Sequence, residues 1–311
     1  MTGVLQAVFM NLRSVDLPTG LFGGGFTGSR SNTIDKINIS SPGNATDFGD
    51  LTVARSQVGS CSSQSRAIFA GGDLSSGFSS VIDYVTFATL GNALSFGNLA
   101  STSQTSRLGA CSSSTRGVFG GGVSSSATTT NYISYITIAT TGNTTLFGDL
   151  TNSRAYVAAC ASTTRGVFAG GYNQSVPASY NIIDYITIAS TGNATDFGDL
   201  LAVINGMAGC SNSTRGLFAA GNPNGGNRIQ YITIASAGNA TDFGDLSTGD
   251  EGATGCASTT RATFTCLGGY GTPTNTIEYV TINTTGNATD FGDLTQSRTA
   301  AGGCSNAHGG L

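Results

Sequence analysis

A segment of about 50 residues recurs along this 311-residue chain, and it constrains the fold more than any other feature. The clearest copy spans residues 154–200. Its last third, GNATDFGDL, returns unchanged at Gly43, Gly238 and Gly286 and in weaker form elsewhere. The copies share a cysteine at intervals of 46 to 50 residues, which indicates one structural unit stacked several times. The repeated cysteines are Cys61, Cys111, Cys160, Cys210, Cys256 and Cys304.

Each repeat predicts four short β-strands. Apolar and β-branched residues form short runs separated by glycine pairs and polar turns, and no run shows a convincing apolar stripe of helical period. In the third run, Ile183 and Tyr185 face one side and Ile186 faces the other, so both faces of this strand are expected to be covered. In the clearest copy, the expected strands are 155–161, 166–169, 182–189 and 195–200.

Four-stranded units of this length, stacked face to face, predict an all-β fold, a six-bladed β-propeller. The first copy lacks its strand one, and the C-terminal TAAGGCSNAHGGL supplies a strand one that runs into the start of a strand two. N- and C-terminal strands are therefore expected in one blade, which removes the exposed edges of an open array. We expect the propeller to span residues 19–311, with residues 1–18 as an N-terminal extension for docking or oligomerisation.

The repeats resemble kelch repeats over about 290 of the 311 residues. The matching features are Arg154 at the start of strand one, the pair Gly170-Gly171 that closes strand two, and an aromatic residue late in the unit. The chain departs from the kelch pattern because this late aromatic is phenylalanine and the chain contains no tryptophan. The resemblance implies a divergent kelch-like propeller, with a protein-interaction adaptor as one function.

The composition points to a second resemblance. Charged residues make up 10% of the chain and glycines number 46, with serine and threonine also abundant. Near-identical repeats of this composition are similar to the repeat proteins of tailed-phage virions, which serve as tail fibres, spikes or capsid decorations. The similarity implies a virion or extracellular-surface protein whose partners are other virion or surface proteins, or a cell-surface glycan.

Charge and hydropathy argue against two other kinds of partner. The formal net charge is −4 and there is no run of Lys or Arg, so nucleic-acid binding through a basic face is not expected. No stretch approaches the ~18 consecutive apolar residues of a membrane-spanning helix. The N-terminus has an apolar patch without a basic region before it and is a poor secretory signal.

Repeated polar residues are expected to build the scaffold rather than a ligand site. Equivalent cysteines on the inner strands of a six-bladed ring are too far apart for disulfides, so each is expected to be a small buried apolar group. Arginines at repeated positions are expected to tie blades together with acids of strand three. The acids are Asp35, Asp83, Asp184 and Glu278. The arginines are Arg55, Arg66, Arg107, Arg116, Arg154, Arg165, Arg215, Arg261 and Arg298.

A repeated pair of aspartates, such as Asp196 and Asp199, is typical of turn capping, in which the side chains accept hydrogen bonds from nearby backbone N–H groups. Calcium binding is the alternative, because aspartate and asparagine oxygens are suitable ligands. The second copy has Ser95 and Asn98 in place of both aspartates, and the third has Leu146 in place of one, which favours turn capping.

Recognition is expected where the copies differ, because shared positions build the scaffold. The most variable segments connect strand two to strand three, and in a propeller these loops share one face. They are rich in Asn, Ser, Thr and Tyr, which suit hydrogen bonding and stacking against a sugar or a protein surface. The candidate ligand-binding residues are Arg30, Tyr172, Asn173, Gln174, Tyr180, Asn222, Asn224, Arg228 and Tyr270.

Catalytic signatures are scarce. The single histidine is His308, and the sequence contains neither GxSxG nor HExxH. We therefore expect a non-enzymatic structural or binding module without a cofactor or a resident metal. The alternatives are a hydrolase or lyase that acts on polysaccharide through carboxylates at the mouth of the propeller, and an adaptor of the kelch type.

Overall fold

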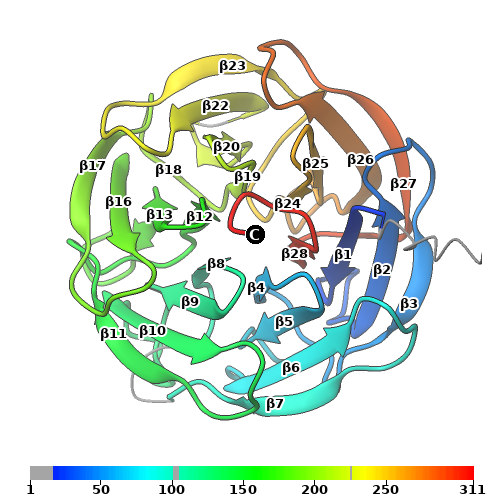
Figure 1. Ribbon diagram of the computed structural model, residues 1–311, viewed down its shortest axis with the longest axis horizontal. Coiled ribbons are helices and arrows are strands. Elements are labelled where there is room, and N and C mark those ends of the chain that lie inside the picture. The colour runs from blue at the N-terminus through cyan, green and yellow to red at the C-terminus, as the bar shows by residue number, and fades with distance from the viewer. Residues whose placement is uncertain (1–16, 101–104, 225) are drawn as a thin grey trace, which may run out of the picture.

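Six four-stranded antiparallel sheets stand around a central axis like the blades of a propeller (Figure 1). The computed structural model describes residues 17–100, 105–224 and 226–311, and every regular element in these ranges is a β-strand. Each sheet runs from an innermost strand near the axis to an outermost strand at the rim. This arrangement confirms the predicted all-β, six-bladed propeller.

The blades are numbered in chain order, and the strands of each blade follow from the axis outward. Blade 1 contains β28 (Gly302–Ser305), β1 (Thr19–Gly23), β2 (Thr33–Asn38) and β3 (Thr46–Asp50). Blade 2 contains β4 (Gly59–Ser62), β5 (Arg66–Ala70), β6 (Val81–Thr86) and β7 (Leu94–Asn98). Blade 3 contains β8 (Gly109–Ser112), β9 (Arg116–Gly120), β10 (Tyr132–Thr137) and β11 (Thr145–Asp149).

Blade 4 contains β12 (Ala158–Ala161), β13 (Arg165–Ala169), β16 (Ile182–Thr187) and β17 (Thr195–Asp199). Blade 5 contains β19 (Ala208–Ser211), β20 (Arg215–Ala219), β22 (Arg228–Thr233) and β23 (Thr241–Asp245). Blade 6 contains β24 (Thr254–Ala257), β25 (Arg261–Thr265), β26 (Thr274–Thr281) and β27 (Thr289–Arg298). Two short ribbons pair β14 (Tyr172–Asn173) with β15 (Ala178–Ser179), and β18 (Ile204–Asn205) with β21 (Asn222–Pro223).

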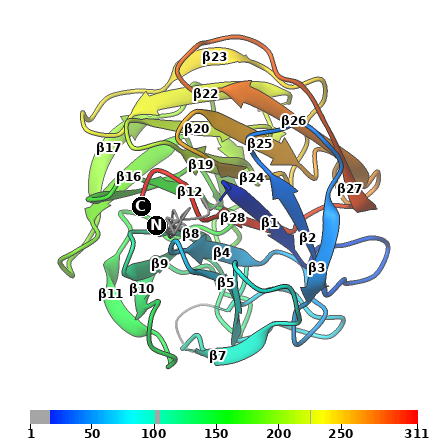
Figure 2. The same cartoon turned by 45° about the vertical axis from the view of Figure 1, so that its right-hand side comes forward.

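The ring closes in blade 1, as predicted, because β28 from the C-terminus pairs with β1 from the N-terminal part of the chain. The expectation that the chain then enters a second strand is wrong. Residues 306–311 instead turn toward the axis and end inside the ring of innermost strands (Figure 1, Figure 2). Docking or oligomerisation is predicted for residues 1–18. Of these, residues 1–16 lie outside the described residues, so this role stays a prediction.

One predicted strand is shorter than expected. Strand one of blade 4 begins at Ala158 rather than at Ala155. Ala155 instead forms a bridge with Tyr172, and Tyr156 has a φ of 58°, a left-handed value that an extended strand does not contain.

Nowhere in the described ranges is there a helix long and apolar enough to cross a membrane.

The hydrophobic core lies between the blades. Six clusters of buried side chains are each built from two neighbouring blades. Blade 4 shows the predicted alternation, because Ile186 packs in the cluster shared with blade 3, and Ile183 and Tyr185 pack in the cluster shared with blade 5. A blade therefore has two buried faces, and the ring has to be complete for every blade to be covered.

The repeated GNATDFGDL segment joins each blade to the next at the rim. The Gly192 N–H of blade 4 donates to the Phe147 carbonyl oxygen of blade 3 at 2.9 Å, and Asn193 Oδ1 accepts from the Asp149 N–H at 3.1 Å. A Cβ at Gly148 would lie 2.2 Å from the Gly192 carbonyl oxygen, so the close approach requires glycine there. All six junctions repeat these contacts, which cover the free edge of each outermost strand.

These rim contacts correct the expectation for the repeated aspartates. Asp196 and Asp199 lie within β17 rather than in the turn, and the side chain that accepts from a backbone N–H is the nearby asparagine. The six asparagines in this role are Asn44, Asn92, Asn143, Asn193, Asn239 and Asn287.

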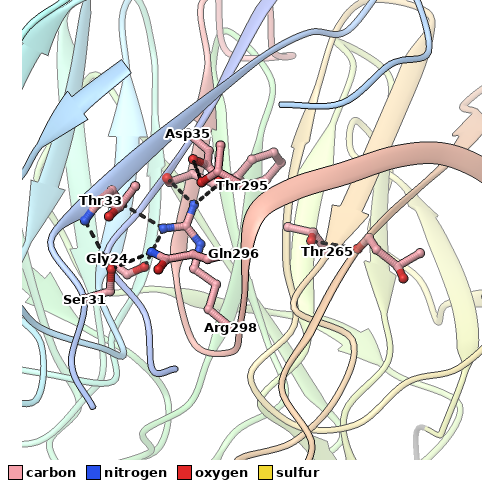
Figure 3. Close-up of polar contacts among 10 residues, drawn as sticks. Gly24, Ser31, Thr33, Asp35, Thr265, Thr295, Gln296 and Arg298 are labelled. Carbon is pink, nitrogen blue, oxygen red and sulfur yellow. Dashed lines mark hydrogen bonds and ion pairs between the residues drawn. The ribbon is translucent and has the colours of Figure 1, made fainter. Parts of the chain in front are cut away.

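Buried ion pairs tie three junctions together, as predicted for the repeated arginines and the strand-three acids. Arg298 of blade 6 contacts Asp35 of blade 1 at 2.9 Å, and both side chains are fully buried. Arg298 also donates to the carbonyl oxygens of Gly24 (3.0 Å) and Thr33 (2.8 Å), so this network seals the junction between the two ends of the chain (Figure 3). The equivalent pairs are Arg55–Asp83 and Arg154–Asp184, each at 2.8 Å. At the junction of blades 5 and 6, Glu278 accepts from the Ser247 N–H instead.

The other repeated arginines lie at the start of strand two, and each connects its own blade to the next one. Arg165 lies 4.5 Å from the ring centroid of Tyr185 in its own blade and donates to the Ile234 carbonyl oxygen of blade 5 at 3.0 Å. The equivalent arginines with both contacts are Arg66, Arg116, Arg215 and Arg261. Arg107 belongs to neither set, and its assignment to the repeated arginines is wrong.

The repeat cysteines are buried and free, as expected from ring geometry. Their sulfur atoms pack against the next blade. A Cβ on Gly166 of blade 4, for example, would lie 2.8 Å from Sγ of Cys111 in blade 3. Cysteine thus provides a compact apolar contact opposite a glycine or alanine.

Breaking the closing ion pair is expected to destabilise the whole ring. In an Arg298→Ile variant, the Asp35 carboxylate stays buried without its partner, which typically costs about 3–5 kcal/mol. The matched control is Arg298→Ile/Asp35→Gln, which copies the neutral residues Ile204 and Gln230 at the junction of blades 4 and 5. Urea unfolding followed by circular dichroism should show the single variant well below the double variant in stability, and equal midpoints would contradict this role.

The buried thiols are expected to resist modification in the folded protein. Burial raises the pKa of Cys111 and Cys256 to about 12 and that of Cys266 to about 11, so little thiolate forms at pH 8. With Ellman's reagent at pH 8, the native protein should release almost no thionitrobenzoate, whereas the protein in 6 M guanidinium should release seven equivalents per chain. Rapid reaction of several thiols in the native state would show that the inner strands are accessible.

Candidate functional site

A closed circle of backbone hydrogen bonds surrounds the axis just before the chain enters each innermost strand. One residue per blade contributes, four positions before the repeat cysteine. Its N–H donates to the carbonyl oxygen of the equivalent residue in the preceding blade, at N···O distances of 2.7 to 3.4 Å. We call these residues the mouth ring, and they are Gln57, Arg107, Tyr156, Gly206, Gly252 and Ala300.

The mouth ring lies on the face from which the strand-two-to-three loops emerge, because strand one begins opposite the end of strand two. In blade 2, for example, Gly59 pairs with Ala70. We call this side the loop face, and we call the opposite side, with the tight turns between strands one and two, the hairpin face. All six variable loops share the loop face, since the strand order and pairing are the same in every blade.

Large side chains at strained backbone positions set three blades apart from the others, because the fourth residue with a Cβ, Ala300, is small. All six residues of the mouth ring have positive φ, from 56° to 89°. Glycine adopts this conformation freely, whereas a residue with a Cβ incurs a cost of roughly 1–2 kcal/mol. Two positions are glycine, yet Gln57, Arg107 and Tyr156 occupy three consecutive ones at φ of 56–58°. Because glycine satisfies the same circle, these side chains are present despite a backbone cost, and such a pattern is a signal of function.

Arg107 is held rigidly at the mouth. Its Nη2 lies 2.9 Å from Asp73 Oδ2, and its guanidinium carbon lies 5.1 Å from the ring centroid of Tyr156 and 5.4 Å from that of Phe78. With its amide oriented to satisfy both ends, Gln174 accepts from Arg107 Nη1 at 2.7 Å and donates to the Ala127 carbonyl oxygen at 3.1 Å. The guanidinium is thus paired, stacked and fixed in orientation.

A second group of contacts reaches the mouth from blades 1 and 6. Gln57 Nε2 donates to the Tyr270 hydroxyl oxygen at 2.7 Å. The ring of Tyr270 packs on that of Phe26, with centroids 5.3 Å apart, and the guanidinium carbon of Arg30 lies 5.4 Å from the Phe26 centroid. Loop residues far apart in the sequence therefore meet beside the mouth ring.

Ionisable groups gather around Tyr156. Burial raises the pKa of Tyr156 to about 12, and the charges of Asp73 and Glu251 act in the same direction while that of Arg107 opposes them. Burial, followed by the negative charge of Asp250, raises the pKa of Glu251 above its usual range. Among the described residues, none hydrogen-bonds the Tyr156 hydroxyl or the Glu251 carboxylate. We call Gln57, Asp73, Arg107, Tyr156, Glu251 and Tyr270 the mouth cluster.

A cavity of about 100 Å³ lies on the axis at the mouth ring, lined by the ring and the first residues of the innermost strands. That is room for about three water molecules at ~30 Å³ each, well below the ~300–1,000 Å³ of pockets that enclose a drug-sized ligand. The cavity can accept one terminal group of a ligand. The rest of such a ligand would lie over the mouth cluster and the loops.

The hairpin-face end of the axis holds a second cavity of about 50 Å³, lined by the innermost strands and His308. His308 Nε2 lies 3.1 Å from the Ser62 carbonyl oxygen, and Nδ1 accepts from the Gly310 N–H at 3.0 Å. These partners place the proton on Nε2, which donates to Ser62. Burial lowers the pKa of His308 to about 4.

The structure brings three of the nine sequence-predicted site residues to the mouth: Gln174 and Tyr270 by hydrogen bonds, and Arg30 through Phe26. The other six make no hydrogen bond or ring contact with the mouth cluster among the described residues. Asn173 Oδ1 accepts from the Ser175 N–H at 2.8 Å, and Asn224 Nδ2 donates to the Val203 carbonyl oxygen at 3.4 Å, so both shape loop backbone. The remaining four lie in or next to short strands of the loop face: Tyr172, Tyr180, Asn222 and Arg228.

Sequence reasoning missed most of the mouth cluster, including Gln57, Arg107 and Tyr156. The signal was present in the sequence: with the copies aligned on the cysteine, the position four residues earlier is among the least uniform. Arg107 occupies this position, whereas Arg55 and Arg154 lie six residues before their cysteines. The rule that recognition lies where copies differ applies to this position as well as to the loops.

Comparisons with known proteins found no relative, since no protein-family model and no curated protein sequence matches the chain. Among residues 17–100, 105–224 and 226–311, no three His, Cys, Asp or Glu side chains gather closely enough to hold a metal ion. The interpretation of the site therefore depends on its geometry.

The stability of the ring is expected to fall in acid through His308. The other titratable side chains that line this end of the axis are the six repeat cysteines, whose raised pKa values keep them neutral. His308 has a pKa of about 4 when folded and about 6.5 when unfolded, so below pH 6.5 protons bind preferentially to the unfolded chain.

This histidine should therefore cost the fold about 2–4 kcal/mol as the pH falls from 6.5 to 4. Urea unfolding should be compared for wild type and His308→Gln across this pH range. Any stability advantage of wild type over the variant should shrink or reverse toward pH 4, because only wild type carries the histidine. A difference that is constant with pH would contradict the neutral, buried histidine.

Proposed function

We propose that this propeller is a non-enzymatic binding module that recognises a glycan or a protein through its loop face, with the mouth cluster at the centre of recognition. The resemblance of the repeats to kelch propellers and to virion repeat proteins supports a role on a virion or an extracellular surface. The partners in that setting are a cell-surface glycan or other surface proteins.

The observation that carries the proposal is the asymmetry of the mouth ring. Its backbone is the same in all blades, yet Gln57, Arg107 and Tyr156 gather on one side and small residues form the other. The bulky side offers an amide and a phenol, with the tyrosine ring beside a fixed guanidinium. Rigid tyrosines next to adaptable polar groups are the combination that binding surfaces use.

The test uses variants that remove side chains without disturbing the backbone. Tyr156→Gly and Gln57→Gly copy the glycines at 206 and 252, so folding should be preserved while contacts are lost. On a glycan array, and on intact cells carrying a surface polysaccharide, wild type should bind selectively. Tyr156→Gly should weaken that binding at least 10-fold, as expected for a residue at the centre of a recognition surface.

Two controls separate the mouth from the loops. Ala300→Gly changes the same backbone position on the small side of the ring and should leave binding within about 2-fold of wild type. The triple variant Tyr172→Ala/Tyr180→Ala/Arg228→Ala tests the outer loop of blade 4 and the start of β22, and should weaken binding less than Tyr156→Gly. Absence of any selective binder, or equal binding by Tyr156→Gly and wild type, would contradict the proposal.

One observation favours the enzymatic alternative, a hydrolase or lyase that acts on polysaccharide. Two carboxyl groups in different environments flank Tyr156: Asp73 is paired with Arg107, and burial raises the pKa of Glu251. Such a difference is typical of a base and an acid in glycoside chemistry. Release of reducing ends from a polysaccharide that wild type binds, abolished by Glu251→Gln, would favour the enzyme over the binding module.

A further inference from the structure

The hairpin-face end of the axis carries a ladder of serine hydroxyls. The residue after the repeat cysteine is the last of each innermost strand. Where it is serine, its hydroxyl donates to the carbonyl oxygen of the equivalent residue in the preceding blade. These bonds are Ser62 to Ser305, Ser112 to Ser62 and Ser211 to Ala161, each at 2.7 Å, and Ser305 to Ala257 at 2.5 Å.

The ladder has two gaps, because Ala161 and Ala257 carry no hydroxyl. A hydroxyl at Ala161 would donate to the Ser112 carbonyl oxygen, and one at Ala257 would donate to the Ser211 carbonyl oxygen. The C-terminal segment meets both: the Gly309 N–H donates to the Ser211 oxygen at 2.9 Å, and Gly310 lies against the Ser112 oxygen. The tail therefore lies at both gaps in the ladder, and it donates a hydrogen bond at one of them, the Ser211 oxygen.

The fit leaves no room for larger residues. A Cβ on Gly309 would lie 2.0 Å from the Asn212 carbonyl oxygen, and a Cβ on Gly310 would lie 1.8 Å from the Ser112 carbonyl oxygen. His308 completes the contact, since its Nε2 lies 3.1 Å from the Ser62 oxygen and 3.3 Å from Ser112 Oγ. His308 and Gly309 thus hydrogen-bond to the hairpin-face end of the ring, and Gly309 and Gly310 fit closely against it.

We propose that the hairpin-face mouth is a peptide-binding socket and that the chain's own C-terminal residues, 307–311, are its ligand. The segment lies beyond β28 and makes its contacts with the ends of β4, β8 and β19 in blades 2, 3 and 5 rather than with its own blade. Asn306 is different, because it exchanges hydrogen bonds with Thr19 and helps to close blade 1. The covalent link keeps the effective concentration of the ligand high, so modest contacts keep the socket filled.

The tail reaches the axial cavity on the hairpin face, because His308 lines that cavity together with the ends of the innermost strands. The contacts of the socket select a short peptide with an imidazole that donates through Nε2, followed by two glycines in succession.

The experiment removes residues 307–311 and supplies them in trans. The truncated protein, which keeps Asn306, should bind the synthetic peptide Ala-His-Gly-Gly-Leu in calorimetry, and its melting temperature should rise when the peptide is added. The peptides Ala-Ala-Gly-Gly-Leu and Ala-His-Ala-Gly-Leu should bind at least 10-fold more weakly. Full-length protein should show no binding, because its socket is occupied.

A folded truncated protein that binds no peptide, or that binds all three equally, would overturn the proposal, as would binding of the peptide by the full-length protein. Because truncation risks misfolding, the full-length variant Gly309→Val provides a second readout. Carboxypeptidase digestion followed by mass spectrometry should trim this variant at least 10-fold faster than wild type. Equal trimming of the two would show that the tail does not occupy a socket.

Discussion

The structure depends on backbone contacts that pass from each blade to the next around a closed circle. At the rim, the turn before strand four of one blade bonds to the outermost strand of the preceding blade, as Gly192 does with Phe147. At the axis, the mouth ring links the same neighbours again. Because the hydrophobic clusters also lie between blades, no blade buries its core alone. Circular closure is what allows such thin units to form one domain.

The repeat explains why so many positions are fixed. The glycine after the late phenylalanine, as at Gly148, leaves space for the next blade's turn, and the asparagine of that turn accepts a bond from the blade behind it. A substitution in one copy therefore affects two blades. Freedom to vary is confined to places that face solvent or the axis. The mouth ring combines both properties, with a constrained backbone and variable side chains.

The two ends of the axis use this freedom differently. On the loop face, Gln57, Arg107 and Tyr156 add polar and aromatic groups to positions where glycine is sufficient. On the hairpin face, Ala161 and Ala257 omit hydroxyl groups, and the C-terminal glycines occupy the gaps. On the hairpin face, the departures from the repeat lie where the C-terminal segment contacts the ring. On the loop face, they lie at an open surface.

The sequence by itself determined the class of fold, the number of blades and their closure in blade 1. A period of about 50 residues with four strand-like runs leaves few alternatives, and Ile183 and Ile186 already indicated two buried faces. It also identified the scaffold role of Arg154 and Asp184, since both residues recur at equivalent positions in other copies.

Only the tertiary structure decided which residues meet at the axis. Gln57 contacts Tyr270, and His308 contacts Ser62, across more than 200 residues. Periodicity describes what a residue shares with its equivalents in other copies, whereas each of these contacts is made in one copy only. These contacts depend on the narrow space at the centre, which exists only once all six blades are in place.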